Sequence, residues 1–225
     1  RGALAVEPEL LAGFGADGHK AFAGPAIGQA NDFARGARDR VLVVADDLGY
    51  ADLGCYGGRD ADFGPVSPVL DGMAAHGLRF TQGYSNSPVC SPTRFALMTA
   101  RWQYRLRGAA EEPINSKSRG SPTLGLPPEH PTLPSLLRHS GYRTALIGKW
   151  HLGWEWQTKD GKPVKRGKKA LGHDIDYTKP ILNGPTTRGF DTYFGTDVPN
   201  FPPYCFIEDD HTVGIPDLEK PASIY

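Results

Sequence analysis

The stretch VLVVADD, at residues 41–47, is the part of the sequence that decides the fold. Its first five residues are apolar and mostly β-branched, which is the pattern of a strand buried on both faces of a sheet. The run ends abruptly in two carboxylates, Asp46 and Asp47. Because ligands of parallel sheets bind beyond the carboxyl ends of the strands, a functional site is also expected here.

Helix and strand signals alternate after this run. Ser67-Pro68 and Ser91-Pro92 each predict the start of a helix, with Ser as the N-cap and Pro in the first turn, and Gly77 is expected to end the first of these helices. A third helix is expected at 132–139, closed by Gly141, and two further strands at 78–81 and 143–147. The alternation predicts an α/β fold with a mainly parallel sheet sandwiched by helices.

The overall composition excludes several classes of partner. The 225 residues carry 25 Lys and Arg against 25 Asp and Glu, so no global field attracts the chain to nucleic acid or to an anionic membrane. No apolar run has the length of a transmembrane helix, and we expect no membrane span. Three cysteines are too few for a disulfide framework, so at least one is free, shared with another chain or chemically used.

Two segments lack a clear pattern of secondary structure. Residues 1–39 are rich in Ala and Gly, and we interpret them as a leader or loosely ordered segment, with the tail of an upstream element as the alternative. Residues 155–185 are polar and are expected to form a surface insertion or loop. The basic run within it, at 165–169, is interpreted as solvated because no aromatic residues are interleaved with it.

The first candidate site is the run from Cys90 to Arg94. If Ser91 caps the helix, Cys90 lies just before the N-terminus, where unpaired N–H groups and the helix dipole favour an anion. Arg94 lies about one turn further on and could hold the same anion or fix the turn. Taken alone, the pattern fits a buried cysteine beside a solvated arginine better than it fits a reactive site.

Two other clusters follow predicted strands. Asp46 and Asp47 repel each other unless donors or a cation compensate, and a hard divalent cation is one natural compensation. Lys149 and His151 would point the same way in extended backbone, as a cation and a proton-transfer group. Taken alone, the two carboxylates fit a helix N-cap pair or a solvated turn, and Lys149 and His151 fit a surface loop.

Two further histidine clusters are interpreted as solvated surface groups rather than as metal sites. The first consists of His173, Asp174 and Asp176 within the polar insertion. The second is His211, which follows the acidic residues at 208–210.

Taken together, the three candidate sites resemble, in their order along the chain and in their residues, the motifs of the sulfatase family within the alkaline phosphatase superfamily. The similar segments are the opening strand and metal-binding turn at 41–57, the two signatures at 90–101 and 148–153, and a later segment at 188–195. The resemblance implies an alkaline phosphatase-like fold, in which residues 40–225 form the N-terminal part of the catalytic domain.

The resemblance also implies a reaction, the hydrolysis of a sulfuric ester as in an arylsulfatase. Cys90 takes the position of the cysteine that a formylglycine-generating enzyme oxidises to formylglycine in this family. Asp46, Asp47 and the group derived from Cys90 would bind Ca²⁺.

The remaining roles are implied in the same way. Arg94 would support the formylglycine, Lys149 would bind the sulfate and His151 would assist proton transfer. The substrate would be a sulfated small molecule or carbohydrate, and the compartment would be periplasmic or secreted.

The sequence also departs from the family pattern. Ala100 stands where the family usually has Gly, and Arg38-Asp39-Arg40 replaces the usual Pro-Asn before the first strand. Later metal ligands and a later Lys and His find no match before Tyr225, so we expect a chain truncated before its later strands and C-terminal domain, and inactive by itself. The alternatives are a phosphoester or phosphonate hydrolase of the same superfamily and a catalytically incomplete fragment.

Overall fold

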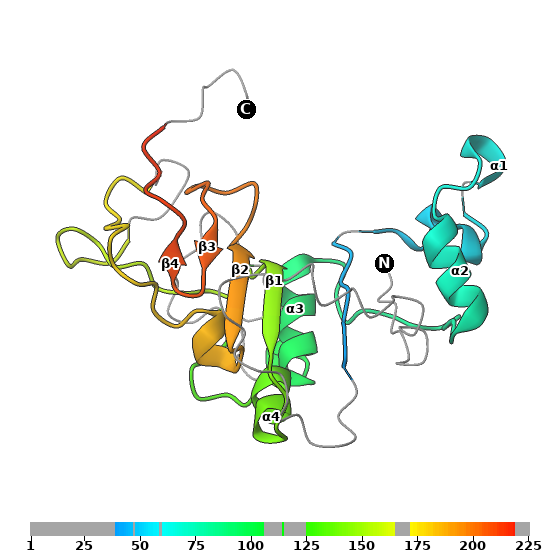
Figure 1. The fold of residues 1–225 in the computed structure, drawn as a ribbon, viewed down its shortest axis with the longest axis horizontal. Helices are drawn as coiled ribbons and strands as arrows, with labels where there is room; N and C mark the ends of the chain where they lie inside the picture. The colour runs from blue at the N-terminus through cyan, green and yellow to red at the C-terminus, as the bar shows by residue number, and fades with distance from the viewer. Residues whose placement is uncertain are drawn as a thin grey trace. The chain divides into compact units, whose positions relative to one another are not determined.

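The computed structural model describes residues 39–46, 48–58, 60–105, 114, 125–164 and 172–218. The chain divides into two compact units, residues 1–88 and 89–225, which are described separately below. Figure 1 shows helices α1 and α2 in the first unit and a sheet with helices α3 and α4 in the second. The proposed leader at 1–39 and the basic run at 165–169 lie outside the described residues, apart from residue 39.

The first unit is built around helix α2, Pro68–His76, which confirms the helix predicted between Ser67 and Gly77. The short helix α1, Asp60–Phe63, and the 3-10 helices Tyr50–Asp52 and Gly54–Tyr56 precede it. The Ser67 hydroxyl does not cap α2. It accepts a hydrogen bond from the Gly54 N–H at 2.9 Å and donates to Asp71 Oδ1 at 3.0 Å. Ser67 therefore ties the 3-10 turn to α2.

The strands predicted at 41–45 and 78–81 are wrong, because the structure assigns neither segment to a sheet. The apolar side chains of the first run are exposed rather than buried, with Val43 at 69%. An apolar, β-branched run becomes a strand only where a neighbouring strand completes its backbone hydrogen bonds. Within the described ranges, no strand pairs with either segment.

The second unit contains a four-stranded sheet in the order β1-β2-β3-β4. The strands are β1 Ala145–Lys149, β2 Thr192–Thr196, β3 Ile207–Glu208 and β4 His211–Thr212. β1 and β2 pair in parallel, whereas the β2–β3 and β3–β4 pairs are antiparallel. The α/β class is confirmed, and the sheet in the described residues is mixed.

Strand β1 begins two residues later than the strand predicted at 143–147. Thr144 is held by side-chain hydrogen bonds instead, since its N–H donates to Asp191 Oδ2 at 2.8 Å and its hydroxyl to the Gly189 carbonyl at 2.7 Å. Further along, Gly148 of β1 lies opposite Gly195 of β2. A side chain at Gly195 would collide with the Gly148 backbone, so this close approach requires glycine.

Two helices belong to the second unit. Helix α4, Leu133–His139, begins as predicted at Thr132, whose hydroxyl accepts from the Ser135 N–H at 3.2 Å. Helix α3, Cys90–Thr99, begins two residues before the predicted start, with Val89 rather than Ser91 as its N-cap. Ser91 does not cap α3, because its hydroxyl accepts a hydrogen bond from the backbone N–H of Ile114 at 2.8 Å.

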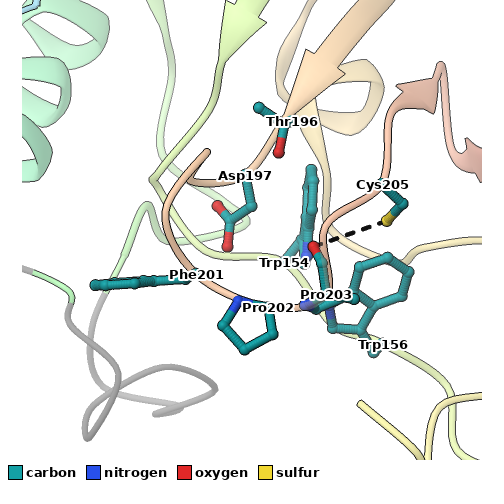
Figure 2. Close-up of a pocket in the computed structure, with 8 residues that line it drawn as sticks. All are labelled: Trp154, Trp156, Thr196, Asp197, Phe201, Pro202, Pro203 and Cys205. Atoms are coloured by element: carbon teal, nitrogen blue, oxygen red, sulfur yellow. Dashed lines mark hydrogen bonds between the residues drawn. The ribbon is translucent and has the colours of Figure 1, made fainter. Parts of the chain in front are cut away.

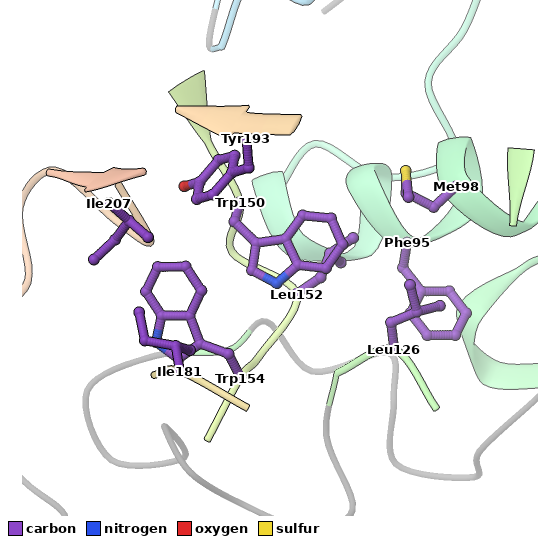
Figure 3. Packing of buried hydrophobic residues seen from close by; sticks show 9 residues of the cluster. All are labelled: Phe95, Met98, Leu126, Trp150, Leu152, Trp154, Ile181, Tyr193 and Ile207. Carbon is purple, nitrogen blue, oxygen red and sulfur yellow. The ribbon is translucent and has the colours of Figure 1, made fainter. Parts of the chain in front are cut away.

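The hydrophobic core of the second unit joins α3 to the segment that follows β1 (Figure 3). Its buried members are Phe95, Met98, Leu126, Trp150, Leu152, Trp154, Ile181, Tyr193 and Ile207. Three of them alternate along 150–154, so this segment is anchored at every second residue. The intervening residue His151 is therefore held in a defined place beside α3.

The sequence predicted that residues 155–185 form a surface insertion or loop. The structure shows that this segment is not simply a surface insertion. It does lack helices and strands over most of its described length. However, Ile175 is completely buried and Ile181 is 3% exposed. Isolated antiparallel bridges join Glu155 to Leu182 and Thr158 to Ile175, so backbone contacts hold parts of this segment together.

Among the described residues, no helix is both long and apolar enough to cross a membrane.

The C-terminal cap of α3 gives a test of the fold. Ala100 has φ 54° and ψ 26°, the left-handed conformation that costs an L-residue roughly 1–2 kcal/mol. Its side chain is exposed, so replacing it leaves no cavity. We expect Ala100→Gly to raise the free energy of unfolding by about 0.5–1 kcal/mol in chemical denaturation.

Ala96→Gly is the matched control, because Ala96 lies inside the same helix. There the added flexibility of glycine has no compensation, and we expect a loss of about 1 kcal/mol. A loss of stability in both variants would show that Ala100 does not hold a left-handed cap.

Candidate functional site

Two sequence motifs that lie far apart in the chain meet at Cys90 and His151. Cys90 is the first residue of α3 and is half-buried, whereas His151 follows the end of β1 and is 3% exposed. The distance between Cys90 Sγ and His151 Nδ1 is 3.2 Å. A sulfur and an imidazole nitrogen at this distance can share a proton.

Arg94 fixes the end of β1 to α3. Its Nη1 donates a hydrogen bond of 2.6 Å to the carbonyl oxygen of Lys149, the last residue of β1. Both roles predicted for Arg94, holding an anion and fixing the turn at Cys90, stay predictions. The contact links the half-buried Lys149 to the first half of α3.

His151 does not have the extended backbone that was assumed for the spacing of Lys149 and His151. Its φ is 53°, in the left-handed region that is costly for a residue with a side chain. The carboxylate of Asp197 accepts a hydrogen bond of 3.2 Å from the His151 backbone N–H. The ring lies edge-on to Phe201, with 6.3 Å between the ring centroids.

The N-terminus of α3 is suited to an anion. The first turn carries no acidic residue, and Val89 provides no side-chain cap. The positive end of the helix dipole and the first backbone N–H groups are therefore not compensated by a carboxylate of the helix itself. The attraction for an anion at this helix end stays a prediction, and the structure places Cys90 inside the first turn.

Of the predicted calcium ligands, Asp46 belongs to the first unit and Cys90 to the second. Asp46 is exposed in the first unit, and Asp47 lies outside the described residues. Across the described part of the chain, no group of three or more His, Cys, Asp or Glu could hold a metal ion. The metal site of Asp46, Asp47 and the group derived from Cys90 stays a prediction.

Sequence reasoning missed Asp197, which directly follows β2. Because β1 and β2 are parallel neighbours, their carboxyl ends lie side by side, and the rule applied to Asp46 and Lys149 points to Asp197 as well. The prediction of β2 itself would have been needed to apply it. Nothing in the sequence singles out Ile114.

Asp197 also borders a small pocket beside His151 (Figure 2). The lining residues are Trp154, Trp156, Thr196, Asp197, Phe201, Pro202, Pro203 and Cys205. Burial, together with the negative charge of Asp197, raises the pKa of the Cys205 thiol to about 11. Cys205 is thus protonated at neutral pH, as expected for a structural cysteine.

The other polar clusters lie at the surface. His173 is exposed, and Asp176 Oδ1 accepts a hydrogen bond of 2.6 Å from the Thr178 hydroxyl. His211 is exposed and its Nδ1 lies 2.6 Å from Asp210 Oδ1. This agrees with their interpretation as solvated groups.

Comparisons with known proteins identify relatives of the chain. It is 36% identical over 160 residues to a steryl-sulfatase of Mus musculus, a match that covers 71% of this chain and 22% of that protein. It is 46% identical over 113 residues to arylsulfatase A of Homo sapiens, covering 50% of this chain and 20% of that protein. The chain therefore spans about a quarter or less of the length of these curated relatives.

A solved structure and a family description agree with these relatives. A protein described as part of the metabolism of multiple glycosaminoglycans by Bacteroides thetaiotaomicron superposes with a TM-score of 0.57 and 28% identity, covering 75% of this chain and 30% of that chain. The family described as Sulfatase matches residues 38–210, which is more than half of the sequence. This chain belongs to the sulfatase family.

Proposed function

We propose that the full-length protein hydrolyses a sulfate ester, with residue 90 as the nucleophile and His151 as its proton acceptor. The observation that carries this proposal is the 3.2 Å contact between Cys90 Sγ and His151 Nδ1 at the N-terminus of α3. The transfer of an anionic group requires a nucleophile, a base and a group that attracts the anion. Here the third group is the end of a helix.

Cys90 fits the role of a cysteine that is converted to formylglycine. It is half-buried beside a base, whereas Cys205 lines the small pocket with Asp197, where burial and the charge of Asp197 raise the pKa of its thiol. Formylglycine in its hydrated form supplies a hydroxyl nucleophile together with a second hydroxyl, whose deprotonation allows the sulfate to leave. We infer that a formylglycine-generating enzyme is the maturation partner.

The other residues support this centre. Arg94 positions Lys149 through the hydrogen bond to its backbone carbonyl. The Lys149 ammonium neutralises charge on the transferred sulfate, as do the first N–H groups of α3. His151 accepts the proton that the hydroxyl of residue 90 loses, and the leaving alcohol takes its proton from an acid outside this set.

A calcium ion fits Asp46 and Asp47 by the type of donor, since carboxylate oxygens are the ligands that Ca²⁺ prefers. Two carboxylates alone supply fewer oxygen ligands than the six to eight of a complete site. When bound, the ion would polarise the sulfate and the attacking oxygen. We therefore assign Asp46 and Asp47 to one side of a calcium site in the full-length protein.

The substrate is a sulfated small molecule or carbohydrate. Among relatives, the name steryl-sulfatase points to a sulfated steroid. The superposed protein of Bacteroides thetaiotaomicron is described for glycosaminoglycan metabolism, which points to a sulfated carbohydrate. Both are alcohol sulfates, so the reaction at residue 90 is the same and only the contacts to the leaving alcohol differ.

The conversion of Cys90 is tested by mass spectrometry. The full-length protein is co-expressed with a formylglycine-generating enzyme, and we expect the peptide that contains residue 90 to carry an aldehyde in place of the thiol. Cys90→Ala is expected to lower the kcat for an aryl sulfate by at least about a thousandfold, because the nucleophile is lost.

Cys55→Ala is the matched control, since Cys55 belongs to the first unit and no part of the proposed reaction is assigned to it. It should retain turnover. Comparison of an aryl sulfate with an aryl phosphate separates the sulfuric ester hydrolase from the related phosphoester hydrolase. Faster turnover of the phosphate, or full activity with unmodified Cys90, would contradict the proposal.

Calcium binding gives a second, independent test. In the full-length protein we expect Asp46→Asn and Asp47→Asn each to weaken calcium affinity on the order of tenfold or more in a calorimetric titration, because one ligand charge is lost. Asp62→Asn is the control, as Asp62 is an exposed carboxylate on α1. Unchanged calcium affinity in both test variants would reduce the pair to an ordinary polar turn.

A further inference from the structure

His151 is part of a closed ring of hydrogen bonds that begins and ends on α3. Its Nδ1 lies 3.2 Å from Cys90 Sγ, and its Nε2 lies 2.6 Å from the carbonyl oxygen of Ile114. The backbone N–H of the same Ile114 donates to the Ser91 hydroxyl at 2.8 Å. Because Cys90 and Ser91 are consecutive, the ring of contacts returns to its starting point.

Three members of this ring are buried, and the fourth, Cys90, is half-buried. Ser91 and His151 are each 3% exposed, and Ile114 is 8% exposed. Water therefore does not compete readily for these hydrogen bonds, and a buried polar group is costly to leave without its partner. This ring of hydrogen bonds therefore holds the imidazole in a fixed position, which a set of surface contacts would not do.

The chemistry of the Ile114 carbonyl decides the tautomer of His151. A carbonyl oxygen only accepts hydrogen bonds, so Nε2 must carry a proton. In the neutral ring Nδ1 is then unprotonated, and its lone pair points at residue 90. The opposite tautomer would place two lone pairs against each other at 2.6 Å.

We infer that Ser91 is a positioning residue, which holds Ile114 so that its carbonyl keeps His151 in the Nε2–H tautomer with Nδ1 as the base toward residue 90. This inference rests on the proposed function for the use of that base. The proton passes from the hydroxyl of residue 90 to Nδ1, so an O–H bond breaks and an N–H bond forms. The ring becomes an imidazolium, and the Ile114 carbonyl continues to accept from Nε2.

The backbone of His151 supports the same interpretation. Its left-handed φ of 53° is maintained by the hydrogen bond from its N–H to Asp197 and by burial of Trp150 and Leu152 on either side. Strain of this kind persists only where the surroundings enforce it. Asp197 positions the backbone, whereas Ser91 acts through Ile114 on the ring.

The tautomer can be measured directly by nuclear magnetic resonance. The chain is labelled with ¹⁵N-histidine in the Cys90→Ser background, which keeps a hydroxyl at residue 90 and removes an ionisable thiol. At a pH where His151 is neutral, we expect its Nε2 to show the shift of a protonated nitrogen and its Nδ1 that of an unprotonated one. An Nδ1–H tautomer, or an even mixture of both, would overturn the inference.

Substitutions of Ser91 test its part in this arrangement. Ser91→Ala in the same background removes the acceptor of the Ile114 N–H, and we expect the ratio of Nε2–H to Nδ1–H tautomer to fall about fivefold. Ser91→Thr restores a hydroxyl and should restore the ratio. Ser140→Ala is the control, because Ser140 is an exposed serine that bonds the Leu136 carbonyl instead. An unchanged ratio in Ser91→Ala would remove Ser91 from the mechanism.

Kinetics separate this inference from the proposed function. In the full-length protein with Cys90 converted to formylglycine, Ser91→Ala should lower kcat for an aryl sulfate about tenfold and leave KM unchanged, since a positioning residue acts on the proton transfer. The tautomer does not depend on turnover. An Nε2–H tautomer in a protein that fails to hydrolyse sulfate esters would contradict the function alone, and a wrong tautomer in an active enzyme would contradict the inference alone.

Discussion

The hydrogen bond from the Arg94 guanidinium to the carbonyl of Lys149 joins α3 to the carboxyl end of β1, and the candidate site depends on this connection. Without it, α3 would lose its direct hydrogen bond to the end of β1, and the contact between Cys90 and His151 would have to hold the helix beside the segment that follows the strand. Core burial of Trp150 and Leu152 acts in the same direction, because it leaves His151 between them no freedom to turn away from α3. Packing therefore sets the approximate position of the imidazole, and hydrogen bonds set its orientation.

Two levels of constraint give the site its chemical character. The N-terminus of α3 favours an anion through its backbone, which requires no particular side chain. The choice of proton acceptor, by contrast, depends on particular partners, namely Asp197 on the His151 backbone and Ile114 on its ring. An anion-binding helix end is common, whereas a cysteine and a buried histidine whose other ring nitrogen meets a carbonyl oxygen are a less common combination, which supports the proposed proton transfer.

Much of this site could be predicted from the sequence, because local patterns determine local structure. Ser67-Pro68 and Thr132 marked two helices, and the pairing of Cys90 with Arg94 over one turn followed from helical spacing. The prediction of a strand at 41–45 was wrong. A strand needs a neighbouring strand, and the composition of the segment does not identify one. The left-handed backbone of His151 and the contact with Ile114 are tertiary features with no local signal.

We propose that residue 90 supplies the oxygen atom that attacks the sulfur of the sulfate ester. The most direct measurement is the intact mass of the full-length Cys90→Ser protein after incubation with an aryl sulfate. A serine hydroxyl can attack sulfur and release the alcohol, but it has no second hydroxyl to expel the sulfate. We predict that each protein molecule releases one equivalent of alcohol and keeps one stable sulfate ester on residue 90. Steady release of many equivalents with residue 90 unmodified would contradict it.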